Sequence, residues 1–149
     1  MKTIQITQDL KVLASILGGF RSLVARNAGV KDAKIGPQSG HDADQDGILG
    51  ELAFCKLMNV WPDLGLSPRS GSADAVVMNK RVDIKTTRHA TGRLLSTLKE
   101  NPDVDIYVLA ILGENEVRFP GFATKDELIR PETITDLGHG KGYALAQEK

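Results

Sequence analysis

The sequence contains a single cysteine, no long apolar run and no excess of charge of either sign. One cysteine excludes an internal disulfide and favours a reducing compartment; we expect Cys55 to be a small core side chain rather than a catalytic thiol. No apolar run reaches the roughly 18 residues that a membrane span needs. Residues 1–9 are polar where a signal peptide would be apolar. We therefore expect a cytoplasmic, intracellular protein that does not bind membranes.

The formal net charge is zero, with 19 basic and 19 acidic residues in a chain of 149. This argues mildly against a nucleic-acid binder, because phosphate contacts require Lys and Arg. The charge is nevertheless uneven along the chain. Six basic residues lie between Lys80 and Lys99, and Asp83 is the only acidic residue among them. The stretch predicts either a positive face for an anionic partner or an ordinary solvated surface.

Length and an apolar content of 41% predict one folded domain over residues 1–149. Apolar residues at three- and four-residue spacing predict a helix over about residues 8–27. A second helix is expected from about Ile48 to Asn59, ended by Trp61-Pro62.

After the second helix the apolar period changes from helical to extended. Short β-rich runs at 73–78 and 81–87 flank Asn79-Lys80, which has the length of a tight hairpin turn. Residues 104–112 are nearly all apolar, which predicts a strand covered on both faces. A short strand at 116–119 follows, and the Thr-x-x-Glu pattern at 124–127 predicts a capped helix. Residues 90–100 fit a helix or a strand.

The predicted hairpin carries charged residues that a structural hairpin does not need. If Asn79 and Lys80 form the turn, Asp74 faces Lys85 and Val76 faces Asp83. Asp74, Asp83 and Lys85 then project from one face, with the two acids about 7 Å apart, which suits a divalent cation between them. An edge hairpin with its charges in water explains the same spacing.

Asp74, followed after eight residues by Asp83-Ile84-Lys85, resembles the active-site pattern of the PD-(D/E)xK nuclease superfamily. Many members add a glutamate from a preceding helix, and Glu51 stands where that residue is expected. Residues 69–74 also resemble the approach to the first aspartate in Holliday-junction-resolvase-like members, although Ala73 replaces the proline of the pattern. The resemblance covers roughly residues 47–87.

This resemblance implies a restriction-endonuclease-like α/β fold, with a central mixed β-sheet flanked by helices. The catalytic core would span about residues 47–122, with a C-terminal helix and tail at 124–149. It also implies a likeness to the small single-domain nucleases carried by phages and mobile elements. A homodimer is expected by the same analogy, because cutting both DNA strands commonly takes two copies of one site.

The activity implied is Mg²⁺- or Mn²⁺-dependent endonucleolytic hydrolysis of DNA phosphodiester bonds. Asp74, Asp83 and Glu51 would bind the metal, together with the main-chain carbonyl of Ile84, and Lys85 would position or deprotonate the attacking water. The predicted catalytic set is therefore Glu51, Asp74, Asp83 and Lys85. The residues expected to contact DNA are Arg69, Ser70, Thr86, Thr87, Arg88, His89 and Arg93.

Two other functions remain open on the sequence. The segment Asp42–Gly47 matches the first half of an EF-hand calcium loop, but Ala53 stands where that loop needs a bidentate glutamate. A non-catalytic DNA-binding or assembly module on the same fold would agree with the zero net charge. The sequence leaves the DNA substrate open between a duplex, a branched junction and an end.

Overall fold

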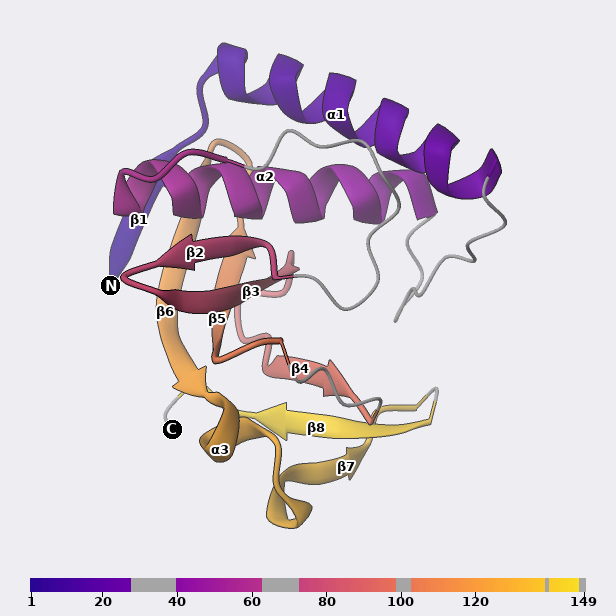
Figure 1. The fold of residues 1–149 in the computed structure, drawn as a ribbon, viewed down its shortest axis with the longest axis vertical. Helices are drawn as coiled ribbons and strands as arrows, with labels where there is room; N and C mark the ends of the chain where they lie inside the picture. The colour runs from indigo at the N-terminus through magenta and orange to yellow at the C-terminus, as the bar shows by residue number, and fades with distance from the viewer. Residues whose placement is uncertain (28–39, 63–72, 99–102, 139, 148–149) are drawn as a thin grey trace.

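The computed structural model describes residues 1–27, 40–62, 73–98, 103–138 and 140–147 (Figure 1). The fold is mixed α/β, as expected. Of the helices in these ranges, none is both long and apolar enough to cross a membrane. The elements in chain order are β1 (Lys2–Gln5), α1 (Gln8–Asn27), α2 (Gly40–Met58), β2 (Ala75–Val77), β3 (Lys80–Thr87), β4 (Leu94–Thr97), β5 (Ile106–Leu112), β6 (Glu116–Thr124), α3 (Lys125–Leu128), a 3₁₀ turn (Pro131–Thr133), β7 (Ile134–Asp136) and β8 (Lys141–Leu145).

The larger sheet has five strands in the order β1-β6-β5-β3-β2. β3 and β5 are parallel, and the other neighbours are antiparallel, so the central sheet is mixed, as predicted. Helix α2 packs on this sheet, and α1 packs on α2 (Figure 1). Ala14 and Leu17 of α1 are buried in that helix–helix contact, together with Ile48 and Leu52 of α2. The helix layer thus covers one face of the sheet.

Strand β5 is covered on both faces, which confirms the reading of its apolar run. Val108, Ala110 and Leu112 belong to the core shared with α2. The alternate residues Tyr107, Leu109 and Ile111 belong to a second core on the opposite face. A parallel strand buried on both sides loses the polar–apolar alternation of a surface strand.

The C-terminal region departs from the predicted helix and tail. The capping box is present, with Thr124 Oγ1 accepting from Glu127 N at 3.3 Å and Glu127 Oε1 accepting from Thr124 N at 3.0 Å, but α3 ends at Leu128. The chain then forms β7 and β8, which join β4 in a three-stranded sheet of order β4-β8-β7. Leu128 is fully buried in the second core. In this sheet β4 pairs with β8, from Leu94 with Leu145 to Thr97 with Gly142, and local sequence spacing does not predict a pairing over such a distance.

Other boundaries also differ. Helix α2 begins at Gly40, eight residues before the predicted start at Ile48, and the N-terminal strand β1 was not predicted. Strand β6 runs to Thr124 rather than to Phe119, and the ambiguous segment contains β4. β1 acquires its strand conformation from pairing with β6, which is distant in sequence.

The hairpin register differs from the prediction. Met78 and Asn79 have φ values of 51° and 64° and form the turn, so Ala75 pairs with Val82 and Val77 with Lys80. The predicted turn at Asn79-Lys80, which placed Asp74 opposite Lys85, is wrong. Moving the turn by one residue moves every partner by two, so the faces of the strands are kept. Asp74 N–H therefore bonds Val82 O, and Asp74 comes to lie beside Asp83.

Candidate active site

The acidic pair Asp74 and Asp83 lies at the edge of β3. In the described part of the chain β2 pairs with β3 only as far as Val82. Beyond that point Asp74 Oδ2 accepts a hydrogen bond from the Ile84 N–H at 2.8 Å, and the Asp74 carboxyl is hydrogen-bonded to that of Asp83. Asp83 Oδ2 also lies 2.7 Å from Lys85 Nζ. Three of the four predicted catalytic side chains therefore meet at this edge.

The sheet separates Glu51 from the aspartate–lysine pair. Asp83 and Lys85 lie in register with Tyr107 and Leu109, so they project from the face opposite α2. Glu51 belongs to α2 and approaches from the other side. Asp74 lies in between, at the strand edge, and the charge of Glu51 acts on it. The predicted set is therefore brought to one strand edge, but not onto one face.

Burial dominates the electrostatics of Asp74. Desolvation, then the hydrogen bond with Asp83, then the charges of Glu51 and Asp83 raise its pKa to about 9, and only the Ile84 N–H opposes them. Asp74 consequently carries a proton at neutral pH in the protein without a bound cation. A protonated Asp74 carboxyl can donate a hydrogen bond to Asp83, and the repulsion between the two side chains is then relieved.

The single cysteine lies in the same environment. Cys55 is buried in the core, and desolvation together with the charges of Glu51 and Asp74 raises the pKa of its thiol to about 11. A thiol with so high a pKa is a poor nucleophile. The structure thus agrees with the expectation that Cys55 is a core residue.

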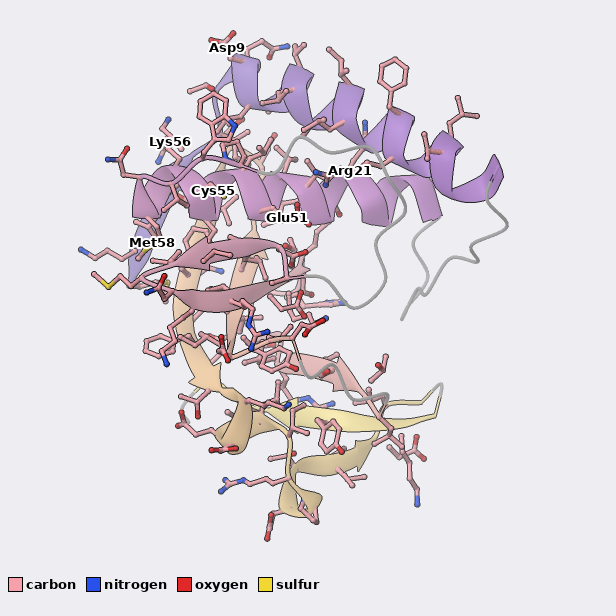
Figure 2. The ribbon with its side chains drawn as sticks, in the orientation of Figure 1. Asp9, Arg21, Glu51, Cys55, Lys56 and Met58 are labelled. Atoms are coloured by element: carbon pink, nitrogen blue, oxygen red, sulfur yellow. The ribbon has the colours of Figure 1, made fainter. Side chains whose placement is uncertain are left out.

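Glu51 is held by an arginine that the sequence reasoning missed. Arg21 of α1 points toward Glu51 (Figure 2), with Nη1 3.3 Å from Glu51 Oε2. Their side chains are only 13% and 19% exposed. A signal was available: Arg21 falls one turn after Leu17, on the face of the amphipathic helix expected to be buried, and a buried guanidinium requires an acidic partner.

A close helix–strand contact sets the position of Glu51 relative to β3. Gly50 of α2 lies against Thr86, and a Cβ added at Gly50 would stand 2.0 Å from Thr86 Oγ1. The absence of a side chain therefore allows α2 to approach the strand that carries Asp83 and Lys85. The neighbouring residue on the helix, Glu51, is brought toward Asp74 by the same contact.

The residues present fit a divalent cation only in part. Among the described side chains, no three or more from His, Cys, Asp and Glu group closely enough to hold a metal ion. The Asp74–Asp83 pair nevertheless has the donor chemistry of a hard-cation site, since two carboxyl groups are brought within hydrogen-bond reach of each other. The Ile84 N–H points to Asp74, and the carbonyl of the same strand residue leaves the backbone toward the same edge. Glu51 does not complete the set, because its carboxylate is turned to Arg21.

The residues predicted to bind DNA have different positions. Arg69 and Ser70 lie outside the described residues. The Thr86 hydroxyl is buried against Gly50, without a hydrogen-bond partner among the described residues, so it is not available to a phosphate. Thr87 Oγ1 accepts from His89 N at 3.2 Å. His89 and Arg93 are exposed beyond the end of β3.

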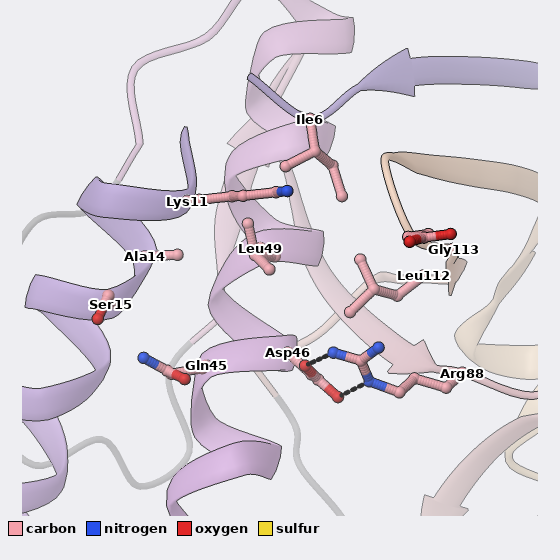
Figure 3. Close-up of a pocket in the computed structure, with 11 residues that line it drawn as sticks. Ile6, Lys11, Ala14, Ser15, Gln45, Asp46, Leu49, Arg88, Leu112 and Gly113 are labelled. Carbon is pink, nitrogen blue, oxygen red and sulfur yellow. Dashed lines mark hydrogen bonds and ion pairs between the residues drawn. The ribbon is translucent and has the colours of Figure 1, made fainter. Parts of the chain in front are cut away.

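Arg88 is engaged within the protein. Its Nε and Nη2 lie 2.6 and 2.7 Å from the two carboxylate oxygens of Asp46, which is buried on α2 (Figure 3). The Arg88–Asp46 ion pair borders a cavity of about 410 Å³ between α1, α2 and the turn after β5. Asp74 and Asp83 do not line this cavity. The residues lining it are Ile6, Lys11, Ala14, Ser15, Gln45, Asp46, Leu49, Arg88, Leu112, Gly113 and Glu114.

The segment expected to form the first half of a calcium loop is helical. Residues 42–47 form part of helix α2, whereas an EF-hand supplies its ligands from a loop that turns around the ion. The carboxylate of Asp46 is directed to Arg88 instead. Within this segment, Asp46 serves an internal ion pair of helix α2.

Comparison with known proteins identifies no relative: no protein-family model, no curated protein and no solved structure matches the chain.

Proposed function

We propose that the protein is a metal-dependent endonuclease that hydrolyses phosphodiester bonds in DNA. The observation that carries the proposal is the meeting of Asp74, Asp83 and Lys85 at one strand edge, where burial raises the pKa of Asp74. Burying such a group is costly, and a structural hairpin gains nothing from it. A strongly perturbed acid beside a lysine is typical of a functional site.

In the proposed reaction, Asp74 and Asp83 would hold Mg²⁺ or Mn²⁺, with the Ile84 carbonyl as a further ligand. When bound, the ion would supply a Lewis acid for the phosphate and lower the pKa of a coordinated water. Lys85 would orient the attacking water or stabilise the charge that develops on the phosphate oxygens. Glu51 would orient water on the other side of Asp74. His89 and Arg93, exposed beyond the strand end, would contact flanking phosphates.

A second candidate is a DNA-binding or assembly module without catalysis. It is favoured by the absence, within the described ranges, of three acids already grouped around a cation position. It is also consistent with Lys85 being held by Asp83 at 2.7 Å.

In the proposed endonuclease, cutting of both DNA strands would require a second copy of the chain or a second binding event. The proposal therefore includes a dimer on DNA.

The test is cleavage of plasmid, linear duplex, single-stranded and four-way-junction DNA with Mg²⁺, Mn²⁺, Ca²⁺ or EDTA. We expect cleavage with Mg²⁺ or Mn²⁺ and none with EDTA. Asp83→Asn and Lys85→Ala should each lower the rate at least about 100-fold, while the exposed control Asp126→Asn on α3 keeps it. DNA binding without cleavage under every condition would establish the second candidate instead.

A further inference from the structure

The outer face of α1, the side turned away from α2, carries exposed apolar side chains. Helix α1 is the outermost element of the helix layer, and its buried residues Ala14 and Leu17 pack against α2 (Figure 1). Four large apolar side chains of α1 are instead between 49% and 55% exposed: Val12, Ile16, Phe20 and Leu23. A helix that is apolar outside its packed face offers a surface that another element can cover.

Gly19 lies among these exposed side chains. A Cβ added at Gly19 meets no heavy atom of the described residues within 4 Å, whereas a Cβ added at Gly18 meets Gln45 Cγ of α2 at 3.0 Å. Gly18 therefore serves the contact between α1 and α2, and Gly19 does not. A glycine inside a helix costs stability relative to alanine, but it lets another backbone approach closely. Gly19 thus favours a partner helix on the outer face.

The spacing of Val12, Ile16, Gly19 and Leu23 is four, three and four residues, which is the spacing of a coiled-coil seam. We call these four positions the α1 seam. If two copies of α1 pair antiparallel about a two-fold axis at the centre of the seam, Ile16 of each copy faces Gly19 of the other. Val12 then faces Leu23 of the other copy. A large side chain is matched with a glycine, so the seam is complementary to itself.

The charges of α1 favour the antiparallel direction. The four seam positions are uncharged, so self-pairing brings no like charges together along the seam. Asp9 is exposed at the start of the helix. A parallel pair in register would place the two Asp9 carboxylates side by side and align the helix dipoles, whereas an antiparallel pair separates the carboxylates by the length of the seam.

The exposed area suits a weak dimer. The four half-exposed apolar side chains present on the order of 400 Å² on each copy, which is comparable to the largest apolar patches of ordinary monomers. With the polar surface around them, two copies would bury roughly 1,000 Å² in total, the lower limit of a specific interface. We therefore expect the dimer to dissociate in the micromolar range.

We propose that the α1 seam is a self-association surface, on which α1 of a second copy packs antiparallel with Ile16 of each copy against Gly19 of the other. The pairing needs neither DNA nor a metal ion and goes beyond the proposed activity. A chain that stays monomeric would refute the seam without refuting cleavage, and a dimer without cleavage would do the reverse.

Sedimentation velocity of the full chain in EDTA, from about 1 to 500 μM, tests the association. We expect the wild type to pass from monomer to dimer across this range. Ile16→Glu should weaken the dimer at least about 100-fold, because it buries an unpaired carboxylate. Trp61→Glu is the matched control: Trp61 is 84% exposed and lies outside the seam, so the dimer should persist. Circular dichroism and urea unfolding establish that each variant is folded.

Gly19→Ala separates a role in pairing from a role in the helix alone. Alanine should raise the urea midpoint of the dilute monomer, because nothing described lies within 4 Å of the added Cβ. The same methyl group should weaken the dimer roughly tenfold, since it occupies the space that Ile16 of the other copy needs. A Gly19→Ala protein that dimerises as well as the wild type would overturn the close contact.

Cysteine cross-linking tests the register and also covers the case in which Ile16→Glu fails to fold. Cys55 is buried, so the wild type should form no disulfide-linked dimer. Val12→Cys mixed with Leu23→Cys should form one under mild oxidation, and neither variant alone should do so, because identical residues lie at opposite ends of an antiparallel seam. Cross-linking of Val12→Cys with itself would refute the antiparallel pairing. A wild type that is monomeric at every concentration, or one that dimerises unless Trp61 is replaced, would refute the seam.

Discussion

Asp74 and Cys55 share one buried acidic environment, and it raises the pKa of both groups. Asp46 is buried as well, and the guanidinium of Arg88 lies against both of its oxygens. The fold therefore gives the two buried aspartates, Asp74 and Asp46, different partners. At the scale of a residue, the sequence specifies which titratable group is present, and neighbours from other elements of the fold determine its protonation.

Replacing Asp74 by Asn should stabilise the metal-free protein. The pKa of Asp74 is about 9 in the folded state against an ordinary value of 3.8, so the folded protein binds the extra proton between these pH values. Its stability therefore falls as pH rises through that window, a dependence that Asn lacks. We expect Asp74→Asn to gain on the order of 2 kcal/mol at pH 8 and little at pH 4, measured by urea unfolding in EDTA.

Mg²⁺ should make the wild type more stable than Asp74→Asn, the reverse of their order in EDTA. A cation that binds only the folded state raises the stability of the wild type by mass action, and Asp74→Asn should lose that gain. Asp126→Asn, an exposed carboxylate, serves as the control and should follow the wild type throughout. Parallel stability curves for Asp74→Asn and the wild type from pH 4 to pH 9 would contradict the assignment of a buried, protonated Asp74.

Helix α2 and strand β3 approach each other closely at a glycine, and this contact positions the site. Gly50 lies against Thr86, whose Oγ1, Cβ and Cγ2 would be 2.0, 3.2 and 3.3 Å from an added Cβ. Rotation of the threonine side chain would move Oγ1, but the Thr86 Cβ at 3.2 Å stays in place, so part of the crowding remains. At the scale of elements, the distance between Glu51 and the β3 edge is set by this glycine.

Gly50→Ala should therefore destabilise the protein by about 1–3 kcal/mol through overpacking, despite the better helix propensity of alanine. Gly47→Ala on the same helix is the matched control: nothing lies within 4 Å of its added Cβ, and it should gain up to about 1 kcal/mol. Both are measured by chemical denaturation. Removal of the overlap in Gly50→Ala with Thr86→Ala should recover part of the loss, and an unperturbed Gly50→Ala protein would show that α2 does not approach β3 so closely.

The hairpin turn offers a second test at this scale. Met78 and Asn79 both have positive φ, and Met78 is 91% exposed, so its side chain contributes little packing to offset the strain. Met78→Asn should raise stability by about 1 kcal/mol, because asparagine tolerates the left-handed region that such two-residue turns require. Lys80→Asn should bring no gain, since Lys80 is a strand residue paired with Val77. If Lys80→Asn raised stability and Met78→Asn did not, the turn would instead be formed by Asn79 and Lys80.

The whole molecule consists of a helix layer on one face of a mixed five-stranded sheet and a smaller sheet with α3 beside its other face (Figure 1). Tyr107, Leu109 and Ile111 of β5 are buried on that second face. The cover comes from segments on both sides of β5 in sequence, β4 before it and α3 and β8 after it. The local sequence of any one of these segments therefore does not predict which other segments pack against it.

Composition and periodicity predicted the mixed α/β class, α1, the doubly covered β5 and the capping box at Thr124, because each depends on neighbours within a few residues. The restriction-endonuclease-like fold and the nuclease activity stay predictions. The sequence by itself determined the charged residues Glu51, Asp74, Asp83 and Lys85 and their order. Only the tertiary structure decided the hairpin register, the second sheet and the pairing of Arg21 with Glu51, since strand pairing and buried charge depend on contacts between distant segments that no local pattern encodes.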